Sequence, residues 1–217
     1  ITTSLQWCIN ELQSIPTFLL NKDEILRESF FVDNNLVSMR IKRLGDFIFS
    51  ILLLIITFPV LSLAAILIKL EDNGPIFYSQ VRNGYKGNSF KIWKLRTMRV
   101  NSETDGAQWA QRADPRITYI GSFLRKMRVD ELPQLIAVIS GKMSLIGPRP
   151  ERPEFDILLE KEIQNYKLRY LLKPGLSGWS QVNYPYGASI KDSKIKLTYD
   201  LFYIENFSNI LDLLILF

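Results

Sequence analysis

Two adjacent carboxylates, Asp130 and Glu131, are the residues of this sequence best placed to do chemistry. They lie within 125–135, RKMRVDELPQL, directly after three cationic side chains. An acidic pair followed by Pro133 and an apolar run indicates a helix start, where backbone N–H groups and the helix dipole attract anions such as phosphate. A carboxylate there can cap the helix, hold a divalent cation or attack phosphorus as a nucleophile. The pair by itself leaves all three roles open.

The composition narrows the chemistry. The 217 residues include no histidine and a single cysteine, Cys8. This excludes His-based acid–base catalysis, Ser-His-Asp triads, His-ligated zinc, internal disulfides and Cys-cluster metal sites. Nucleophilic and acid–base chemistry therefore falls to carboxylates, Lys, Tyr or Ser.

The charge is concentrated around the acidic pair. The chain carries a net charge of +5, and residues 82–152 contain 14 Lys and Arg against 6 Asp and Glu. Such a patch predicts an anionic partner. The sequence contains no zinc finger, RNA-binding signature or clear recognition helix, so nucleic acid is not the expected partner.

Arg149 stands out within the basic region because it lies between Pro148 and Pro150. The two prolines stiffen the backbone on both sides of the arginine. A guanidinium on a rigid backbone suits phosphate recognition, since its two donors fork onto phosphate oxygens. The alternative is a proline-rich connector with an incidental arginine.

A long apolar segment precedes the basic region. Residues 47–68 form 22 residues without a charge, and about 20 apolar residues span a bilayer. Pro59 lies near the middle and is expected to kink a helix. Either a kinked helix crosses the membrane, or a re-entrant hairpin turns at Pro59 and leaves on the side it entered. Basic residues on both flanks favour two cytoplasmic flanks, but the residues alone leave both topologies open.

The rest of the chain reads as mainly helical with one small β-hairpin. Residues 76–81 and 90–95 alternate like strands around an Asn83-Gly84 turn. A polar loop is expected over 101–116, and a last, partly amphipathic helix over 194–217. Residues 1–38 carry no catalytic motif and are predicted to be a linker from a region upstream. The apolar segment beside a phosphate-binding region points to a phosphorylated lipid or a nucleotide-linked substrate.

From about Arg40 to Phe217 the chain resembles the bacterial sugar transferases. These are monotopic polyprenyl-phosphate glycosyl-1-phosphate transferases, which begin exopolysaccharide or O-antigen assembly. The resemblance rests on a basic start before the Pro-broken apolar segment and on ordered motifs: GPIFYSQ (74–80), FKIWKLRTM (90–98), DPRIT (114–118), LRK (124–126), DELPQ (130–134), MSLIGPRP (143–150), KPGLSGW (173–179) and YDL (199–201). So many motifs in order make the likeness specific.

The resemblance implies a reaction. The family transfers a sugar 1-phosphate from a UDP-sugar to undecaprenyl phosphate and releases UMP, using Mg²⁺. Its mechanism implies that Asp130 is the nucleophile, that a phosphosugar-aspartate intermediate forms, and that Glu131 is the partner of Asp130. Kinetics of this kind are ping-pong.

The resemblance also implies an architecture. It favours a re-entrant membrane helix over 39–70 that bends at Pro59, interfacial amphipathic helices, and a catalytic domain over 71–217 with a C-terminal amphipathic helix. The domain is expected on the cytoplasmic face of the bacterial inner membrane. Many members carry Ser before the proline, where this chain has Phe58.

We combine the two lines of inference in one hypothesis. Asp130 and Glu131 bind Mg²⁺, and four cationic side chains surround the phosphates, since phosphoryl transfer needs charge neutralisation: Lys94, Arg96, Arg125 and Arg149. Two rivals are a non-enzymatic, membrane-anchored basic module that binds anionic lipid or an assembly partner, and a hydrolase that transfers to water. The sequence leaves the sugar and the oligomeric state open, a homodimer included.

Overall fold

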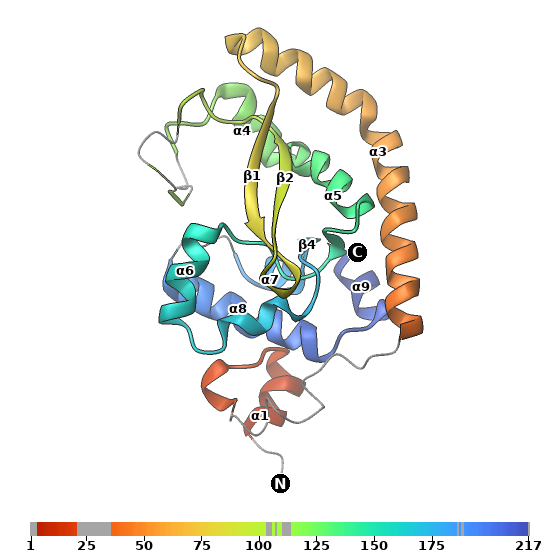
Figure 1. Ribbon diagram of the computed structural model, residues 1–217, viewed down its shortest axis with the longest axis vertical. Coiled ribbons are helices and arrows are strands. Elements are labelled where there is room, and N and C mark those ends of the chain that lie inside the picture. Colours follow the sequence, from red (N-terminus) through yellow and green to blue (C-terminus); the bar gives the residue numbers. More distant parts are fainter. Residues whose placement is uncertain are drawn as a thin grey trace.

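The computed structural model in Figure 1 describes residues 4–20, 36–102, 106, 108–109, 114–185, 187 and 189–216. Helices dominate these residues, together with one small antiparallel sheet and one small parallel pair. This confirms the predicted mainly helical class with a β-hairpin. The elements are α1 (Ser4–Trp7), η1 (Cys8–Leu12), η2 (Thr17–Leu19), α3 (Leu36–Asp72), β1 (Phe77–Asn83), η4 (Tyr85–Gly87), β2 (Ser89–Leu95), α4 (Tyr119–Lys126), η5 (Val129–Gln134), α5 (Leu135–Ile139), β3 (Ser144–Ile146), α6 (Pro153–Glu162), η6 (Tyr166–Leu171), β4 (Gly175–Ser177), α7 (Trp179–Asn183), α8 (Ile190–Glu205) and α9 (Asn209–Leu216).

The apolar segment forms α3, which continues through Pro59 and curves along one side of the molecule (Figure 1). Thr57 and Ser62, which flank the proline, donate their hydroxyl hydrogens to carbonyls four residues back, at 2.6 and 2.9 Å. Such back-bonding bends helices, as does a proline. Within the described residues, α3 is the helix long and apolar enough to cross a membrane.

One stripe of α3 faces the rest of the protein, and the remaining surface of the helix is exposed and apolar. Ile55, Ile56 and Phe58 each keep about two thirds of their surface exposed, at 66–70%. The stripe repeats every three to four residues and consists of buried or half-buried side chains at 46, 50, 54, 57, 61, 64 and 68.

Both ends of α3 are fastened to the same folded unit. Near its start, Lys42 Nζ lies 2.5 Å from an Asp212 carboxylate oxygen on α9. At its end, the Asp72 carboxylate accepts two hydrogen bonds from the Arg96 guanidinium, with Nη1 at 2.6 Å. The curved helix is therefore anchored at two points of one domain.

The hairpin forms as predicted, with a longer connection. Strands β1 and β2 pair antiparallel in a register that places Asn83 opposite Ser89. The chain turns through 84–88, which contains the short helix η4, instead of in a tight Asn83-Gly84 turn. The end of β2 carries Lys94 into the centre of the molecule.

The predicted last helix over 194–217 is two helices, α8 and α9, separated at 206–208. Helix α8 lies in the main core, where Leu197, Leu201 and Ile204 are almost fully buried. The parallel pair β3–β4 packs there too, and Gly147 approaches the backbone of Gly175 so closely that a Cβ on either would clash.

The part of the predicted linker that the structure describes, 4–20, packs on this core. Ile15 is fully buried and its backbone N–H donates to the Thr198 carbonyl at 2.9 Å. Trp179 Nε1 donates to the Gln13 carbonyl at 3.0 Å. Residues 1–3 and 21–35 lie outside the described residues, and the linker over 1–38 stays a prediction.

Candidate active site

The acidic pair occupies the first turn of η5, between α4 and α5. Arg128 adopts the left-handed conformation, with φ 58°, and redirects the chain so that Asp130 and Glu131 point inward. Both carboxylates are buried, at 7% and 8% exposure. The expected helix start is therefore confirmed, although its first turn is a 3-10 helix that continues into α5.

Glu131 is the ion-paired member of the dyad. Arg149 donates from both terminal nitrogens to its carboxylate, with Nη1 3.2 Å from Oε2, and Lys94 Nζ lies 3.0 Å from Oε1. Arg128 approaches only to 3.9 Å and is exposed. Burial alone would raise the pKa of Glu131, but Arg149 and Lys94 hold it well below its usual range. Glu131 is therefore a fixed negative charge that aligns two cations.

Asp130 differs from its neighbour in its surroundings. Among the described residues, the ion pairs of the dyad all fall on Glu131, while the Asp130 side chain borders the cavity described below. Burial raises the pKa of Asp130, and the negative charge of Glu131 adds to this effect. Lys94 and Arg125 act in the opposite direction. The result is a carboxylate more basic than usual beside two cations, which suits a nucleophile.

Lys94 reaches the dyad from the C-terminal end of strand β2. Burial lowers the pKa of its ammonium to about 8, with the positive charge of Arg149 contributing and Glu131 opposing. The lowered pKa means that Glu131 does not fully compensate the hydration that the ammonium loses on burial. An incoming phosphate would place further negative charge beside it.

Arg125 comes from the other side, at the end of α4. Its Nε donates to the Thr97 hydroxyl at 2.7 Å, which orients the guanidinium beside the cavity. Helix α4 can lie this close to the chain after β2 because it carries Gly121 at the contact: a Cβ there would meet the Thr97 carbonyl at 2.1 Å. Thr118 caps the helix by accepting from the Gly121 N–H at 3.0 Å.

Arg96 is placed differently from the other three predicted phosphate ligands. Its side chain is buried, and its guanidinium is engaged by Asp72 and by the Pro75 carbonyl, the latter at 2.6 Å from Nε. Arg96 borders the cavity, but its donors serve to fasten α3 to β2. The structure therefore brings Lys94, Arg125 and Arg149 together around the dyad, and the role of Arg96 as a phosphate ligand stays a prediction that its contacts do not favour.

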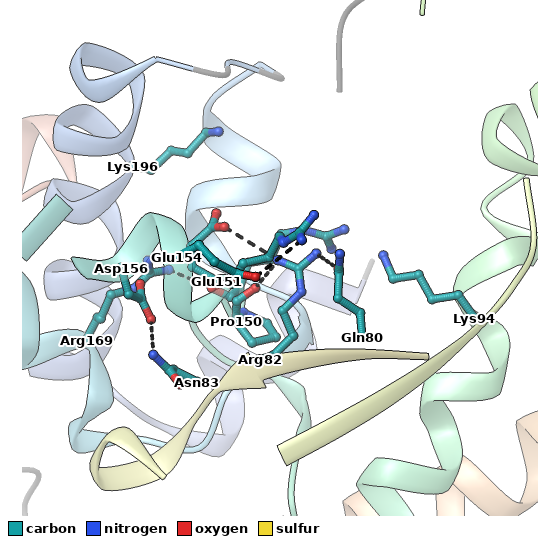
Figure 2. A network of polar contacts seen from close by, with 12 residues as sticks. Gln80, Arg82, Asn83, Lys94, Pro150, Glu151, Glu154, Asp156, Arg169 and Lys196 are labelled. Carbon is teal, nitrogen blue, oxygen red and sulfur yellow. Dashed lines mark hydrogen bonds and ion pairs between the residues drawn. The ribbon is translucent and has the colours of Figure 1, made fainter. Parts of the chain in front are cut away.

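One cavity of about 1100 Å³ joins these residues. It runs from the dyad toward α6 and α8, and Figure 2 shows Lys94 and Lys196 on opposite sides of this space. Cations far outnumber carboxylates in its wall, as expected for a site that takes polyanions. Its charged lining includes Arg82, Lys94, Arg99, Arg125, Lys126, Arg128, Arg149, Arg152, Arg169 and Lys196, against Asp130, Glu131 and Glu151.

Seven of these cations were not predicted as site residues: Arg82, Arg99, Lys126, Arg128, Arg152, Arg169 and Lys196. Arg82 and Arg152 counted only toward the net charge of the basic region. Lys196 lies on α8, far from the dyad in sequence, and no spacing pattern connects the two. A charge inventory could have found the cations within 82–152, but Arg169 and Lys196 reach the cavity only through tertiary packing, of α6 on β1 and of η6 and α8 on α6.

The residues of the site could hold a magnesium ion only together with substrate phosphates. Within the described part of the chain, no group of three or more Asp, Glu or Cys side chains gathers that could hold a metal by itself. Magnesium is commonly held by one or two carboxylates together with substrate phosphates. Asp130 meets that requirement. The Glu131 oxygens already accept hydrogen bonds from Lys94 and Arg149, so a metal ion there would compete with two cations.

Comparison with known protein families shows which family the chain belongs to. Residues 37–217 match the family described as "Bacterial sugar transferase". The chain belongs to the bacterial sugar transferase family. The match covers α3 and every element that builds the cavity, and it begins after the described N-terminal segment 4–20.

Several curated transferases resemble the chain. A UDP-N-acetylgalactosamine-undecaprenyl-phosphate N-acetylgalactosaminephosphotransferase of Aeromonas hydrophila is 45% identical over 82% of this chain and 42% of its own length. A UDP-glucose:undecaprenyl-phosphate glucose-1-phosphate transferase of Escherichia coli (strain K12) is 37% identical over 83% of this chain and 39% of its own. The chain thus spans about two fifths of the length of these two transferases. A third relative is the exopolysaccharide production protein PSS of Rhizobium leguminosarum bv. phaseoli, which is 36% identical over 82% of this chain and 92% of its own length.

Proposed function

We propose that this protein transfers a sugar 1-phosphate from a UDP-sugar to undecaprenyl phosphate and releases UMP. One observation carries the proposal: Glu131 is fixed by Arg149 and Lys94, while the adjacent Asp130 borders a cavity rich in cations. The relatives supply the substrate classes, because their names specify UDP-sugars and undecaprenyl phosphate. Those names differ in the sugar, so the sugar used by this chain stays open.

We assign the reaction two steps. In the first, an Asp130 carboxylate oxygen bonds to the phosphorus that bears the sugar, and the bond from that phosphorus to the UMP oxygen breaks. In the second, an oxygen of the lipid phosphate attacks the same phosphorus, and the bond to Asp130 breaks, restoring the carboxylate. Lys94, Arg125 and Arg149 neutralise the phosphate oxygens in both steps.

Magnesium belongs to the proposal as a cofactor. Asp130 would hold it together with diphosphate oxygens of the donor, and the ion would supply charge neutralisation at those oxygens. Glu131, which the sequence hypothesis also names as a metal ligand, acts chiefly as the anion that orders Lys94 and Arg149.

We further propose that α3 is re-entrant and that the domain lies on the cytoplasmic face of the bacterial inner membrane. Both ends of α3 are fastened to one domain, through Lys42–Asp212 and Asp72–Arg96. A helix held in this way cannot place its ends on opposite faces of a bilayer without pulling the domain apart. Such a topology lets one site meet a soluble donor and a membrane-bound acceptor.

Helix α4 supports the same placement. Tyr119, Phe123 and Met127 are spaced by four residues, and 58–87% of each is exposed. Apolar side chains on one face, with Lys126 and Arg128 nearby, are typical of a helix that lies in the membrane interface. Arg125 on this helix reaches the cavity, so the lipid phosphate has a short route from the interface to Asp130.

The proposal is tested by measuring UMP release from a panel of UDP-sugars with Mg²⁺, with and without undecaprenyl phosphate. Lipid-dependent UMP from one sugar, lost in Asp130→Asn, would establish reaction and donor. Sugar phosphate released without lipid would favour the hydrolase. No UMP from any sugar, in protein shown to be folded in lipid, would favour the binding module, whose lipid binding would fall smoothly with salt.

A further inference from the structure

The backbone that carries Arg149 is held in an unusual way. Pro148 and Pro150 have no N–H to donate, so this segment is held mainly through its carbonyl oxygens. Four consecutive carbonyls, 148 to 151, each accept a hydrogen bond from elsewhere in the chain. The first and last of these donors are backbone N–H groups, those of Gly175 and Asn83, each at 2.9 Å.

The two middle donors are arginine side chains, Arg169 buried and Arg82 partly buried. Arg169 Nη2 donates to the Arg149 carbonyl at 2.6 Å, and Arg82 Nη1 donates to the Pro150 carbonyl at 3.0 Å. Figure 2 shows Arg82 rising from β1 against Pro150, with Arg169 on the far side of the same segment. Arg169 thus holds the peptide group directly after the Cα of Arg149, and Arg82 holds the peptide group that follows it.

Arg169 is itself fixed by buried partners. Its Nη2 also lies 3.1 Å from Asp200 on α8, and its Nη1 donates to the Tyr166 hydroxyl. Tyr166 donates onward to Asp156 at 3.0 Å, and Asp156 accepts from the Asn83 side chain at 2.8 Å. The network therefore joins η6, α6, α8 and β1 around the segment that presents Arg149 to the dyad.

Arg82 is held from its other side. Its Nη2 donates to the side-chain carbonyl of Gln80 on the same strand, and Glu151 lies 3.5 Å from its Nη1. Its side chain is 16% exposed, so it is placed by these contacts and not by solvent. Strand β1 thereby sets the position of Pro150.

We propose that Arg82 and Arg169 are positioning residues, which hold the carbonyls of Pro150 and Arg149 and so keep the Arg149 guanidinium on Glu131. The expected effect of these two residues on turnover rests on the proposed function. A misplacement of a charged group by about 1 Å can cost roughly 100-fold in rate. Rigid placement of Arg149 is therefore expected to matter for turnover.

The experiment is a double-mutant cycle on UMP release, with the chain in lipid nanodiscs and R82K, R169K and R149K made singly and in pairs. Lysine keeps the charge and removes the forked donors. Each single variant should lose roughly 10- to 100-fold in kcat. Adding R82K or R169K to R149K should lower kcat little further, because Arg82 and Arg169 act on catalysis through Arg149. Lys167→Ala, an exposed neighbour of Arg169 on η6, is the matched control and should keep full activity.

If R82K or R169K lowers kcat by the same factor with and without R149K, Arg82 or Arg169 acts on the substrate itself. That result would overturn the inference. So would full activity in R82K and R169K.

A second measurement does not depend on catalysis. The coupling between Arg149 and Glu131, obtained from chemical unfolding of R149K, E131Q and the double variant, should shrink in an R169K background. A coupling unchanged by R169K would overturn the inference even if UMP release were never observed. Absence of UMP from the wild-type protein would count against the proposed function alone.

Discussion

Arg149 Nη1 lies 3.2 Å from Oε2 of Glu131, and the second terminal nitrogen of the same guanidinium donates to Oε1. The carboxylate next to Asp130 is thus committed to a bidentate ion pair. Bidentate pairs fix orientation as well as charge. In the proposed mechanism the two carboxylates therefore have different roles: Glu131 orders the cations, and Asp130, which lines the cavity, meets the substrate.

Asp130→Asn is predicted to abolish transfer and to stabilise the fold. The pKa of Asp130 is raised by burial and by the charge of Glu131. A raised pKa means that the protonated form is favoured in the folded state, so the ionised carboxylate weakens the fold at neutral pH. Removing the charge should raise the free energy of unfolding by roughly 0.5–2 kcal/mol. Thermal unfolding in nanodiscs checks this, and a lower melting temperature in D130N would contradict it.

Glu131→Gln is predicted to have the opposite effect on stability. Its pKa is held low by Arg149 and Lys94 against the effect of burial, so its ionised form stabilises the fold above the unfolded pKa. Losing the charge leaves two partly buried cations without their carboxylate partner and should cost roughly 3 kcal/mol. The difference from wild type should shrink as pH falls through the acid range. A difference that grew in acid would show that the pairing argument is wrong.

The pH dependence of kcat/KM on the alkaline side should follow the deprotonation of Lys94. Its pKa is lowered to about 8, first by burial. As pH rises through about 8, Lys94 loses its charge, so kcat/KM for the UDP-sugar should fall, since that ratio follows the free enzyme. In K94R the guanidinium stays protonated, and the fall should disappear even if activity at pH 7 is lower. A wild-type profile flat from pH 7 to 10 would contradict the assignment.

Gly121→Ala is predicted to damage the site from a distance. The added Cβ would lie 2.1 Å from the Thr97 carbonyl, so α4 must move away and take Arg125 with it. Overpacking of this kind costs roughly 1–3 kcal/mol, and transfer should fall. Gly45→Ala on α3 is the control, because its Cβ would meet only Phe49, at 3.9 Å. Equal effects of the two substitutions on unfolding would refute the packing argument.

The topology of α3 can be read by labelling. Cys8 is the single cysteine, so a Cys8→Ser background accepts one reporter at a time. Arg40→Cys lies on α3 before its uncharged stretch, 47–68, and Asn88→Cys lies after α3; both positions are exposed. A membrane-impermeant maleimide should label both from the same side of vesicles of known orientation. Labelling from opposite sides would establish a spanning helix.

The sequence predicted the elements that depend on local patterns. The hairpin followed from alternation, the helix start at the dyad from an acidic pair before Pro133, and the long helix from 22 uncharged residues. Periodicity could not show that α3 fastens at both ends, because its partners Asp212 and Arg96 are defined only by tertiary packing. The same limit explains Arg96, whose place among basic residues suggested phosphate but whose guanidinium pairs with Asp72.

The placement of Arg149 was also predicted only in part. Two flanking prolines suggested a stiff backbone, and the structure has one, but the rigidity depends as much on Arg82 and Arg169. Those residues lie 67 positions before and 20 positions after Arg149 in the chain. Their contacts are with backbone carbonyls, which leave no pattern in side-chain spacing.

The central claim, that Asp130 becomes covalently linked to the sugar phosphate, is tested most directly by intact-protein and peptide mass spectrometry. The chain is incubated with the UDP-sugar that supports transfer and Mg²⁺, without lipid acceptor, and quenched. The account predicts a stoichiometric burst of UMP and a sugar-phosphate adduct on the peptide containing Asp130, absent in D130N and removed by added undecaprenyl phosphate. UMP formed only when the acceptor is present, with no adduct on the protein, would show direct transfer and contradict the account.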